Sequence, residues 1–432
     1  MKRTLPLLLL AGCVSDATQA DWDALDRDVN SVAAPVPEAP APAEVEGKLE
    51  VMLETARARN PALRQALQQA RAALERVGEA AAWEDVVLKF TVDDGVVRSP
   101  LSVDRAASLM VGLLQMIPAL GKIDARTEAA VQEGRAALEM YRAAERDVAR
   151  DVRRAFAEYD EATRLRELHS RHEKILADFE KVADAKYKAG TAVQSDVLKA
   201  QIELARLRAM IADNERGAVT AVARLNQLMH RPGDATLGPP PAAEPAPESF
   251  DLNALLKNAL TERPEMRAAQ ATLEAARAQQ RLAGVEATVP QFDVEALYGF
   301  VSGDDDVYDA GFSMNLPWLN SGRAARERAA GRTRAASEDA LLALADGVAY
   351  EVRAGVAEAE AARKIAELYR TEILERARQA VEVTRKGYEN NTVGFLDLLD
   401  AERSHRDAEI EYARSVARVR LARAILERAV GR

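Results

Sequence analysis

The sequence predicts a mainly α-helical protein with a small β part, built from long antiparallel helical hairpins and four β-strands. Three observations support this fold class. The 432-residue chain is 48% hydrophobic and 30% charged but only 5% aromatic, a balance typical of long helices. Two runs of about 65 residues, 122–186 and 323–386, have helical character and contain no proline. Shorter segments alternate apolar and polar residues, as strands do.

The chain is divided into two similar halves by a proline-rich stretch, 231–250. Three landmarks recur at offsets of 203, 199 and 201 residues: Asn60-Pro61 and Arg263-Pro264, Pro118 and Pro317, and the segments 187–198 and 388–399. Matched landmarks at nearly constant spacing indicate an internal duplication. The predicted repeats are 48–230 and 251–432. Each has the order helix, two strands, long helix, turn, long helix, with 48–82 as the first helix.

The N-terminus carries an export signal. Residues 2–3 are basic, residues 5–11 are mostly apolar, and Leu-Ala-Gly-Cys at 10–13 resembles the bacterial lipoprotein processing box. We therefore expect a signal peptide over 1–12 and a lipidated tether over 13–47, with a diacylglycerol on Cys13, the only cysteine. Val14 follows it, and the lack of aspartate there favours sorting to the outer membrane. Four closely spaced prolines in 35–42 predict an extended tether.

Two β-hairpins are predicted, at about 86–118 and 291–317. In the second, apolar residues from Phe292 to Phe300 and from Tyr308 to Met314 alternate with polar ones. Strands of about 10 residues with one apolar and one polar face are typical of membrane barrels, whereas a half-buried hairpin in a soluble domain is the alternative. In the first hairpin, 107–117 is apolar on both faces, so its assignment as a strand depends partly on its counterpart.

No stretch is long and apolar enough to predict a transmembrane helix, so a membrane crossing would need strands closed into a barrel. Four strands are too few, because such barrels begin at about 8 strands. Copies of the chain must then share one barrel. Three copies would supply 12 strands and a hollow interior, whereas two would give a barrel filled by side chains.

These features together resemble the TolC family of outer-membrane efflux proteins, over about residues 47–431. The resemblance implies a homotrimer with a shared 12-stranded transmembrane β-barrel in the cell outer membrane and a long helical tube in the periplasm. It also implies a passive exit duct of a tripartite efflux or secretion system, joined to a periplasmic adaptor (membrane fusion) protein and an inner-membrane pump of RND or similar type. The alternative is a periplasmic lipoprotein scaffold of long coiled helices with no pore.

The two turn segments are the most specific part of the resemblance, which implies that they dock the adaptor through Tyr187, Gly190, Thr191, Asp196, Tyr388, Asn391 and Thr392. Gly190 allows a tight turn, and Thr191 with Asp196 is expected to cap the returning helix. Asn391 stands in place of a glycine and tolerates the left-handed conformation.

Asp397 and Asp400 are spaced i, i+3 on one helix face. The resemblance implies that they line the periplasmic aperture, where threefold symmetry would form acidic rings that select cations. The alternative is that both are solvated or capping carboxylates. Val393 stands where some family members have a basic residue that latches the gate.

No pattern predicts catalysis, a nucleotide loop or a nucleic-acid surface, so the chain is not expected to be an enzyme. His169 and His172 share a helix face but lack a cysteine or third ligand in sequence, which favours a surface pair and no metal site. No cofactor is expected beyond the lipid on Cys13. Metal ions and organic compounds are equally compatible with the sequence as substrates.

Overall fold

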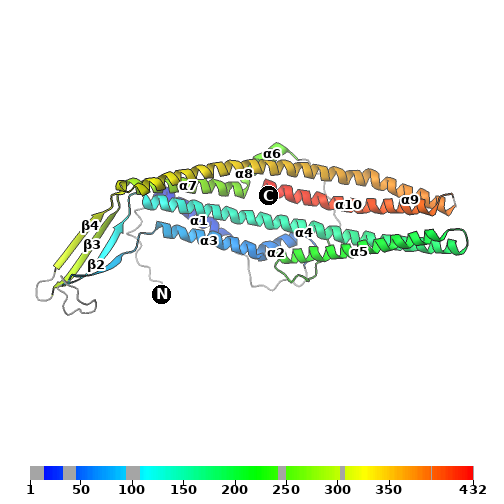
Figure 1. The fold of residues 1–432 in the computed structure, drawn as a ribbon, viewed down its shortest axis with the longest axis horizontal. Helices are drawn as coiled ribbons and strands as arrows, with labels where there is room; N and C mark the ends of the chain where they lie inside the picture. The colour runs from blue at the N-terminus through cyan, green and yellow to red at the C-terminus, as the bar shows by residue number, and fades with distance from the viewer. Residues whose placement is uncertain are drawn as a thin grey trace. The chain divides into compact units, whose positions relative to one another are not determined.

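The computed structural model describes residues 14–32, 45–93, 108–241, 250–301, 307–390 and 392–431 (Figure 1). The chain forms two compact units, and each contains parts of both repeats. The first unit comprises 1–33, 66–140 and 265–344, and the second comprises 34–65, 141–264 and 345–432. The duplication along the sequence is therefore not a division into two separate folded halves.

Within the described residues, the first repeat follows the predicted order after an N-terminal helix. Its elements are α1 (Asp16–Ser31), α2 (Leu49–Arg59), α3 (Pro61–Ala81), β1 (Val87–Asp93), β2 (Ser108–Ile117), α4 (Lys122–Lys188) and α5 (Gln194–Leu228). The long helix predicted from 122 is confirmed, with 67 residues. The single helix predicted over 48–82 is wrong, because Pro61 has no N–H to donate and begins a separate helix.

The second repeat has the same order. Its elements are α6 (Leu252–Glu262), α7 (Pro264–Thr288), β3 (Phe292–Val301), β4 (Val307–Met314), the 3₁₀ turn η3 (Pro317–Leu319), α8 (Ser321–Leu368), the π-helical turn η4 (Tyr369–Ile373), α9 (Leu374–Glu389) and α10 (Phe395–Val430). The backbone stays right-handed helical on both sides of the π turn, at Leu368 and Leu374. Thus α8, η4 and α9 form one run that matches α4, with one wider turn in it.

The duplication extends to the ends of the helices. In the first repeat the Asn60 side chain donates to the carbonyl of Leu228 at the end of α5, at 2.9 Å. At the equivalent place, Arg263 donates to the carbonyl of Ala429 at the end of α10. His230 and Gly431, 201 residues apart, both have positive φ, 52° and 87°. Equivalent residues therefore satisfy equivalent helix C-termini in the two repeats.

The four strands form one antiparallel sheet in the order β1-β2-β3-β4, within the first unit. Ile117 is the last residue of β2, directly before Pro118, as expected for a residue that cannot donate to the ladder. Gly121 then has a φ of 81°, which L side chains rarely adopt, and α4 begins at the next residue. The predicted strand at 107–117 is confirmed over 108–117, the part that the structure describes.

The first unit also contains α1, where the sequence predicted an extended tether. That prediction is wrong for 16–31. The Ser15 hydroxyl caps the helix by accepting from the Thr18 N–H, and Leu25 and Val29 are fully buried. Gly134 in α4 leaves room for Leu25, since a Cβ there would lie 2.6 Å from its side chain. The remainder of the predicted tether, 33–44, lies outside the described residues, as does Cys13.

Among the helices that the structure describes, none has an apolar stretch able to cross a bilayer.

Candidate functional site

The two faces of the sheet differ sharply in polarity. Register places one row of side chains from each strand on the same face, for example Phe90, Val111, Tyr298 and Tyr308. The large exposed apolar residues of this row are Leu88, Phe90, Leu113, Ile117, Val294, Tyr308, Phe312 and Met314, which we call the apolar sheet face. The predicted alternation of the second hairpin is thus confirmed, and the row of apolar side chains extends across all four strands.

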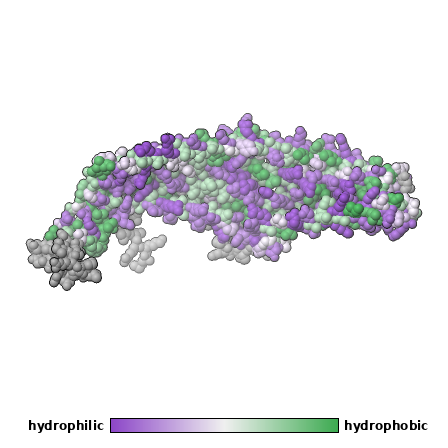
Figure 2. Space-filling view, viewed as in Figure 1, coloured by the Kyte–Doolittle hydropathy of each residue, from purple (hydrophilic) through white to green (hydrophobic). Residues whose placement is uncertain are grey.

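Aromatic pairs reinforce the apolar sheet face. Phe292 stacks on Phe312 with ring centroids 5.4 Å apart, and Tyr298 lies 5.2 Å from Tyr308. Such cross-strand pairs stabilise a sheet, but they do not cover it. Hydrophobic surface is visible over part of the strands in Figure 2. A monomer in water rarely leaves a contiguous apolar surface of this kind exposed, so the face is suited to a partner or to lipid.

The opposite face carries the charged groups. Lys89 forms an ion pair with Glu295 at 2.8 Å, across β1 and β3. Asp293 accepts a hydrogen bond from Ser313 at 3.3 Å. Some apolar side chains of β2 also lie on this face, which matches the weak alternation of 107–117. The sheet therefore separates an apolar from a charged environment.

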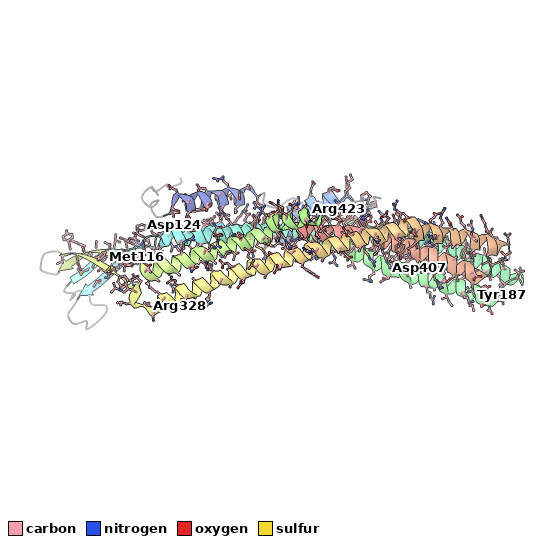
Figure 3. The ribbon with its side chains drawn as sticks, turned by 90° about the horizontal axis from the view of Figure 1, so that it is seen from above. Met116, Asp124, Tyr187, Arg328, Asp407 and Arg423 are labelled. Carbon is pink, nitrogen blue, oxygen red and sulfur yellow. The ribbon has the colours of Figure 1, made fainter. Side chains whose placement is uncertain are left out.

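Both turn segments lie at one end of the second unit, which we call the helical tip: residues 187–198 and 388–400. Tyr187 is labelled there in Figure 3. Gly190 has a φ of 72°, so the tight turn predicted for it is confirmed. Its counterpart, Asn391, lies outside the described residues.

Each threonine at the tip forms a hydrogen bond with the helix that ends before its turn. Thr191 Oγ1 donates to the carbonyl of Lys186 at 3.1 Å, and Thr392 Oγ1 donates to that of Gly387 at 3.1 Å. The prediction that Thr191 with Asp196 caps the returning helix is therefore wrong. Residue 193 occupies the N-cap of α5 and makes no side-chain hydrogen bond, while Asp196 lies in its first turn. An acidic side chain there is still favoured by the helix dipole.

The tyrosines of the two turns have different surroundings. Tyr187 is 43% exposed, whereas Tyr388 is 9% exposed and packs on Phe395 with ring centroids 5.8 Å apart. The Lys186 ammonium lies 3.8 Å from the centroid of the Tyr388 ring and joins the two turns. Burial raises the pKa of Tyr388, and the charge of Asp196 adds to that effect. Tyr388 is thus a core residue of the tip.

The predicted aperture residues are both exposed at the start of α10. The Asp397 carboxylate accepts from the backbone N–H of Gly394 at 3.2 Å, so it caps this helix. Asp400 is 77% exposed, and its nearest cation is Arg403, at 3.8 Å. Neither carboxylate is committed to a buried ion pair, so both are available to face a lumen.

One buried carboxylate links the repeats behind the tip. Glu203 of α5 accepts hydrogen bonds from Arg403 of α10 and, at 2.8 Å, from Arg206. Burial alone would raise the pKa of Glu203, but these guanidinium groups outweigh it and hold the pKa below its ordinary value. The ion pair therefore persists at neutral pH and fixes α10 against α5.

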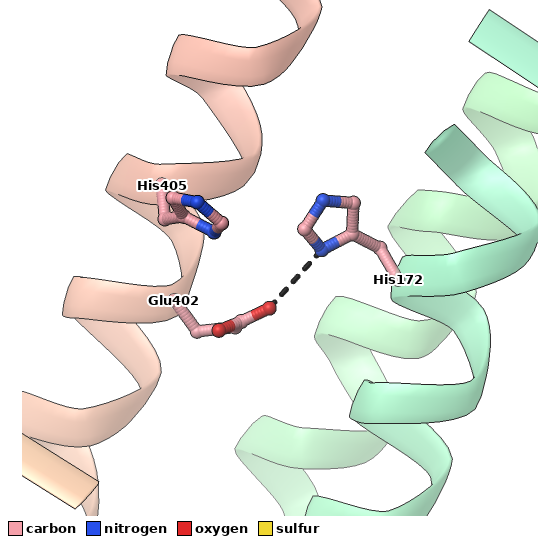
Figure 4. A group of neighbouring side chains, drawn as sticks. All are labelled: His172, Glu402 and His405. Carbon is pink, nitrogen blue, oxygen red and sulfur yellow. Dashed lines mark hydrogen bonds and ion pairs between the residues drawn. The ribbon is translucent and has the colours of Figure 1, made fainter. Parts of the chain in front are cut away.

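The histidines differ from the prediction. His169 and His172 are not a surface pair but are buried, 4% and 1% exposed. His172 Nδ1 lies 3.0 Å from Glu402, and Nε2 lies 2.6 Å from Glu409. His405 lies beside them (Figure 4). The sequence offered one signal for this cluster: Glu402, His405 and Glu409 are spaced i, i+3, i+7 along α10.

Ionisation of this cluster follows from its contacts. Ionised carboxylates only accept, so a ring with both nitrogens facing them donates twice and is protonated. Burial acts to lower the pKa of His172, but the two glutamates outweigh it and raise the pKa. Burial acts to raise the pKa of Glu409, but His172 lowers it on balance. In His169, burial and the charge of His172 lower the pKa.

Long helical hairpins and an antiparallel sheet of four strands, with one apolar and one charged face, define the class of fold. Several solved structures share the fold, and three of them are OprN, VceC and MtrE. The outer-membrane channel OprN matches with a TM-score of 0.77 and 19% identity, over 97% of this chain and 93% of that one. VceC from Vibrio cholerae matches with a TM-score of 0.76 and 18% identity, over 89% of this chain and 96% of that one. The open state of MtrE from Neisseria gonorrhoeae matches with a TM-score of 0.75 and 20% identity, over 93% of this chain and 95% of that one.

The family model for outer membrane efflux proteins matches residues 52–230 and 255–432. The chain therefore belongs to the outer membrane efflux protein family, as the resemblance to TolC proteins predicted. No curated protein sequence matches it significantly. The family is one of channels, not enzymes, and it supports an outer-membrane location and an efflux exit duct.

Proposed function

We propose that the chain is the passive exit duct of a tripartite efflux system and works as a homotrimer. The apolar sheet face is the observation that carries this proposal. It spans all four strands, and the charged face lies behind it. Lipid outside and a wet lumen inside would satisfy both faces at once.

The free edges of the sheet support the trimer. Within the described residues, β1 pairs only with β2 and β4 only with β3. Unpaired strand edges in lipid would leave backbone groups without hydrogen bonds, at several kcal/mol each. Pairing β4 of one copy with β1 of the next removes the edges, and three copies supply 12 strands around a hollow interior.

The helical tip would then be the periplasmic aperture and adaptor-docking end. Its exposed residues, including Tyr187 and Thr191, offer contacts to an adaptor, while its buried ones hold the turns together. Asp397 and Asp400, repeated by threefold symmetry, would form rings that attract cations. An inner-membrane pump of RND or similar type would supply the energy. Cys13 would carry the lipid that anchors the N-terminus.

Conductance of the purified protein in planar bilayers tests this proposal. The wild type should form trimers and open cation-selective channels. Asp397→Asn with Asp400→Asn removes the charge but keeps an acceptor for the Gly394 N–H. It should weaken block by divalent cations and so raise the conductance measured in their presence. Asp213→Asn is the matched control, an exposed aspartate on α5 with an i+3 arginine partner, and should leave currents unchanged.

A monomer that binds membranes without conductance would overturn the duct and favour the lipoprotein scaffold. Trimeric channels whose currents are unaffected by the double substitution would leave the duct intact but remove Asp397 and Asp400 from the aperture.

A further inference from the structure

A cluster of metal-ligating side chains lies between α4 and α10. His172 comes from α4, and Glu402 and His405 come from successive turns of α10 (Figure 4). One ligand atom from each of the three lies within 4.8 Å of the others. All three residues belong to the second unit, so the cluster lies within one compact body.

The hydrogen-bonding of the cluster is incomplete without a further cation. Glu402 is 4% exposed, and His172 is its only hydrogen-bond partner among the described residues. His405 is half-buried and makes no hydrogen bond within the part of the chain that the structure describes, although its ring lies 6.1 Å from that of His172. A buried carboxylate and two imidazoles thus lie close together, and some of their oxygen and nitrogen atoms have no hydrogen-bond partner among the described residues.

We propose that His172, Glu402 and His405 bind a divalent transition-metal ion of the zinc class and fasten α4 to α10. Two imidazoles and one carboxylate are an established zinc donor set, with a fourth position left for water. Metal–ligand bonds of about 2.0–2.1 Å in tetrahedral geometry place ligand atoms roughly 3.4 Å apart. His172 Nδ1 and Glu402 are 3.0 Å apart, and rotation of His405 would bring its nitrogen within reach.

Glu409 would complete the site from outside. Its carboxylate lies 2.6 Å from His172 Nε2, the nitrogen that does not face Glu402. A histidine that binds metal through one nitrogen usually donates the other N–H to a carboxylate, which fixes the ring and its tautomer. Arg171 in turn pairs with Glu409 at 2.9 Å. The ion would replace the proton on Nδ1, since metal and proton compete for that lone pair.

The chemistry of the ligands selects the class of ion. Imidazole suits zinc, nickel and copper(II), whereas calcium and magnesium prefer oxygen donors alone. No thiolate or thioether is among the three ligands, so a soft monovalent ion is disfavoured. Because the ligands come from both repeats, the ion would hold the first turns of α10 against α4.

Zinc titration of the untagged, full-length protein, stripped with a chelator, tests the site. We expect one saturable Zn²⁺ per chain by calorimetry and a higher Tm with zinc than without. His405→Asn should weaken binding by more than about 100-fold, and Glu409→Gln by roughly 10- to 100-fold, as for other outer-shell partners. His230→Asn, an exposed histidine outside the cluster, should bind zinc like the wild type.

His405→Asn is the preferred ligand variant, because His405 lacks hydrogen bonds among the described residues and its loss should leave the fold intact. His172→Asn would leave the buried carboxylate of Glu402 without its hydrogen-bond partner among the described residues, so it is a less clean test. Cobalt(II) in place of zinc should give the intense visible absorption of a tetrahedral site. Absence of saturable binding, or binding unaffected by His405→Asn, would overturn the proposal. Neither readout depends on conductance, so the exit-duct proposal can fail or stand separately.

Discussion

The first and second turns of the helical tip share a sequence pattern but not an environment. In both turns a threonine hydroxyl donates to a backbone carbonyl of the helix that ends there, at 3.1 Å. Yet Tyr187 is exposed while Tyr388 is buried, and only the second turn has a side-chain cap on the returning helix, from Asp397. Local hydrogen bonding thus follows the duplicated sequence, whereas burial follows the tertiary packing around each copy.

The largest expected effect on stability comes from replacing the tyrosines of the two turns. Tyr388→Ala should lower the free energy of unfolding by about 3 kcal/mol, because it leaves a cavity beside Phe395 and Leu398. Tyr187→Ala should cost well under about 1 kcal/mol, as for most surface changes. Chemical denaturation of both variants measures the difference. Equal losses would contradict the different burial of the two tyrosines.

Tyr388→Phe sharpens the same contrast. The Tyr388 hydroxyl is buried without a hydrogen-bond partner among the described residues. Since an unsatisfied buried hydroxyl costs about 1–3 kcal/mol, its removal should leave the tip as stable or raise its unfolding free energy by up to about 1 kcal/mol. Tyr187→Phe should have no effect. Destabilisation by Tyr388→Phe, seen as faster amide exchange at the tip, would show that the hydroxyl has a partner after all.

Substitution of the glycine of the first turn should have a smaller effect than Tyr388→Ala. Gly190 has positive φ, and nothing lies within 4 Å of a Cβ placed on it, so substitution there reports backbone conformation alone. Gly190→Ala should cost about 1–2 kcal/mol, and Gly190→Asn, which copies the residue type of the second turn, should cost less. Thermal unfolding compares the two. A larger loss for asparagine would contradict the left-handed turn.

The long helices and the second hairpin could be predicted because each depends on local periodicity and on proline. The first hairpin could be predicted because the duplication repeats the order of the second. Pro118 ends a strand, and Pro61 and Pro264 begin helices, whatever surrounds them. The helix α1 was missed, because its burial depends on Leu25 meeting Gly134, more than 100 residues away. Sequence composition there suggested only a tether.

The histidine cluster was missed for the same physical reason. His172 and Glu402 are separated by 230 residues, and no local rule brings them together. The i, i+3, i+7 spacing on α10 could have marked one side of the cluster, but the opposing ligand comes from α4. The capping role of Asp397, in contrast, involves only the N–H of Gly394, three residues away, and local sequence was enough to keep it open as an alternative.

The docking of α1 has a consequence for the proposed lipid anchor. The Ser15 N–H and the Thr18 hydroxyl both donate to Asp124 at 2.8 Å, at the start of α4 and seven residues after the end of β2 (Figure 3). Burial alone would raise the pKa of Asp124, but these hydrogen bonds and Arg281 hold it below its ordinary value, so the attachment survives at neutral pH. Cys13 precedes Ser15 by two residues, a covalent reach of about 7 Å. If the chain is the proposed duct, a lipid joined to the chain so near this hydrogen-bonded attachment would limit how far the strand-to-helix junction can move from the membrane surface.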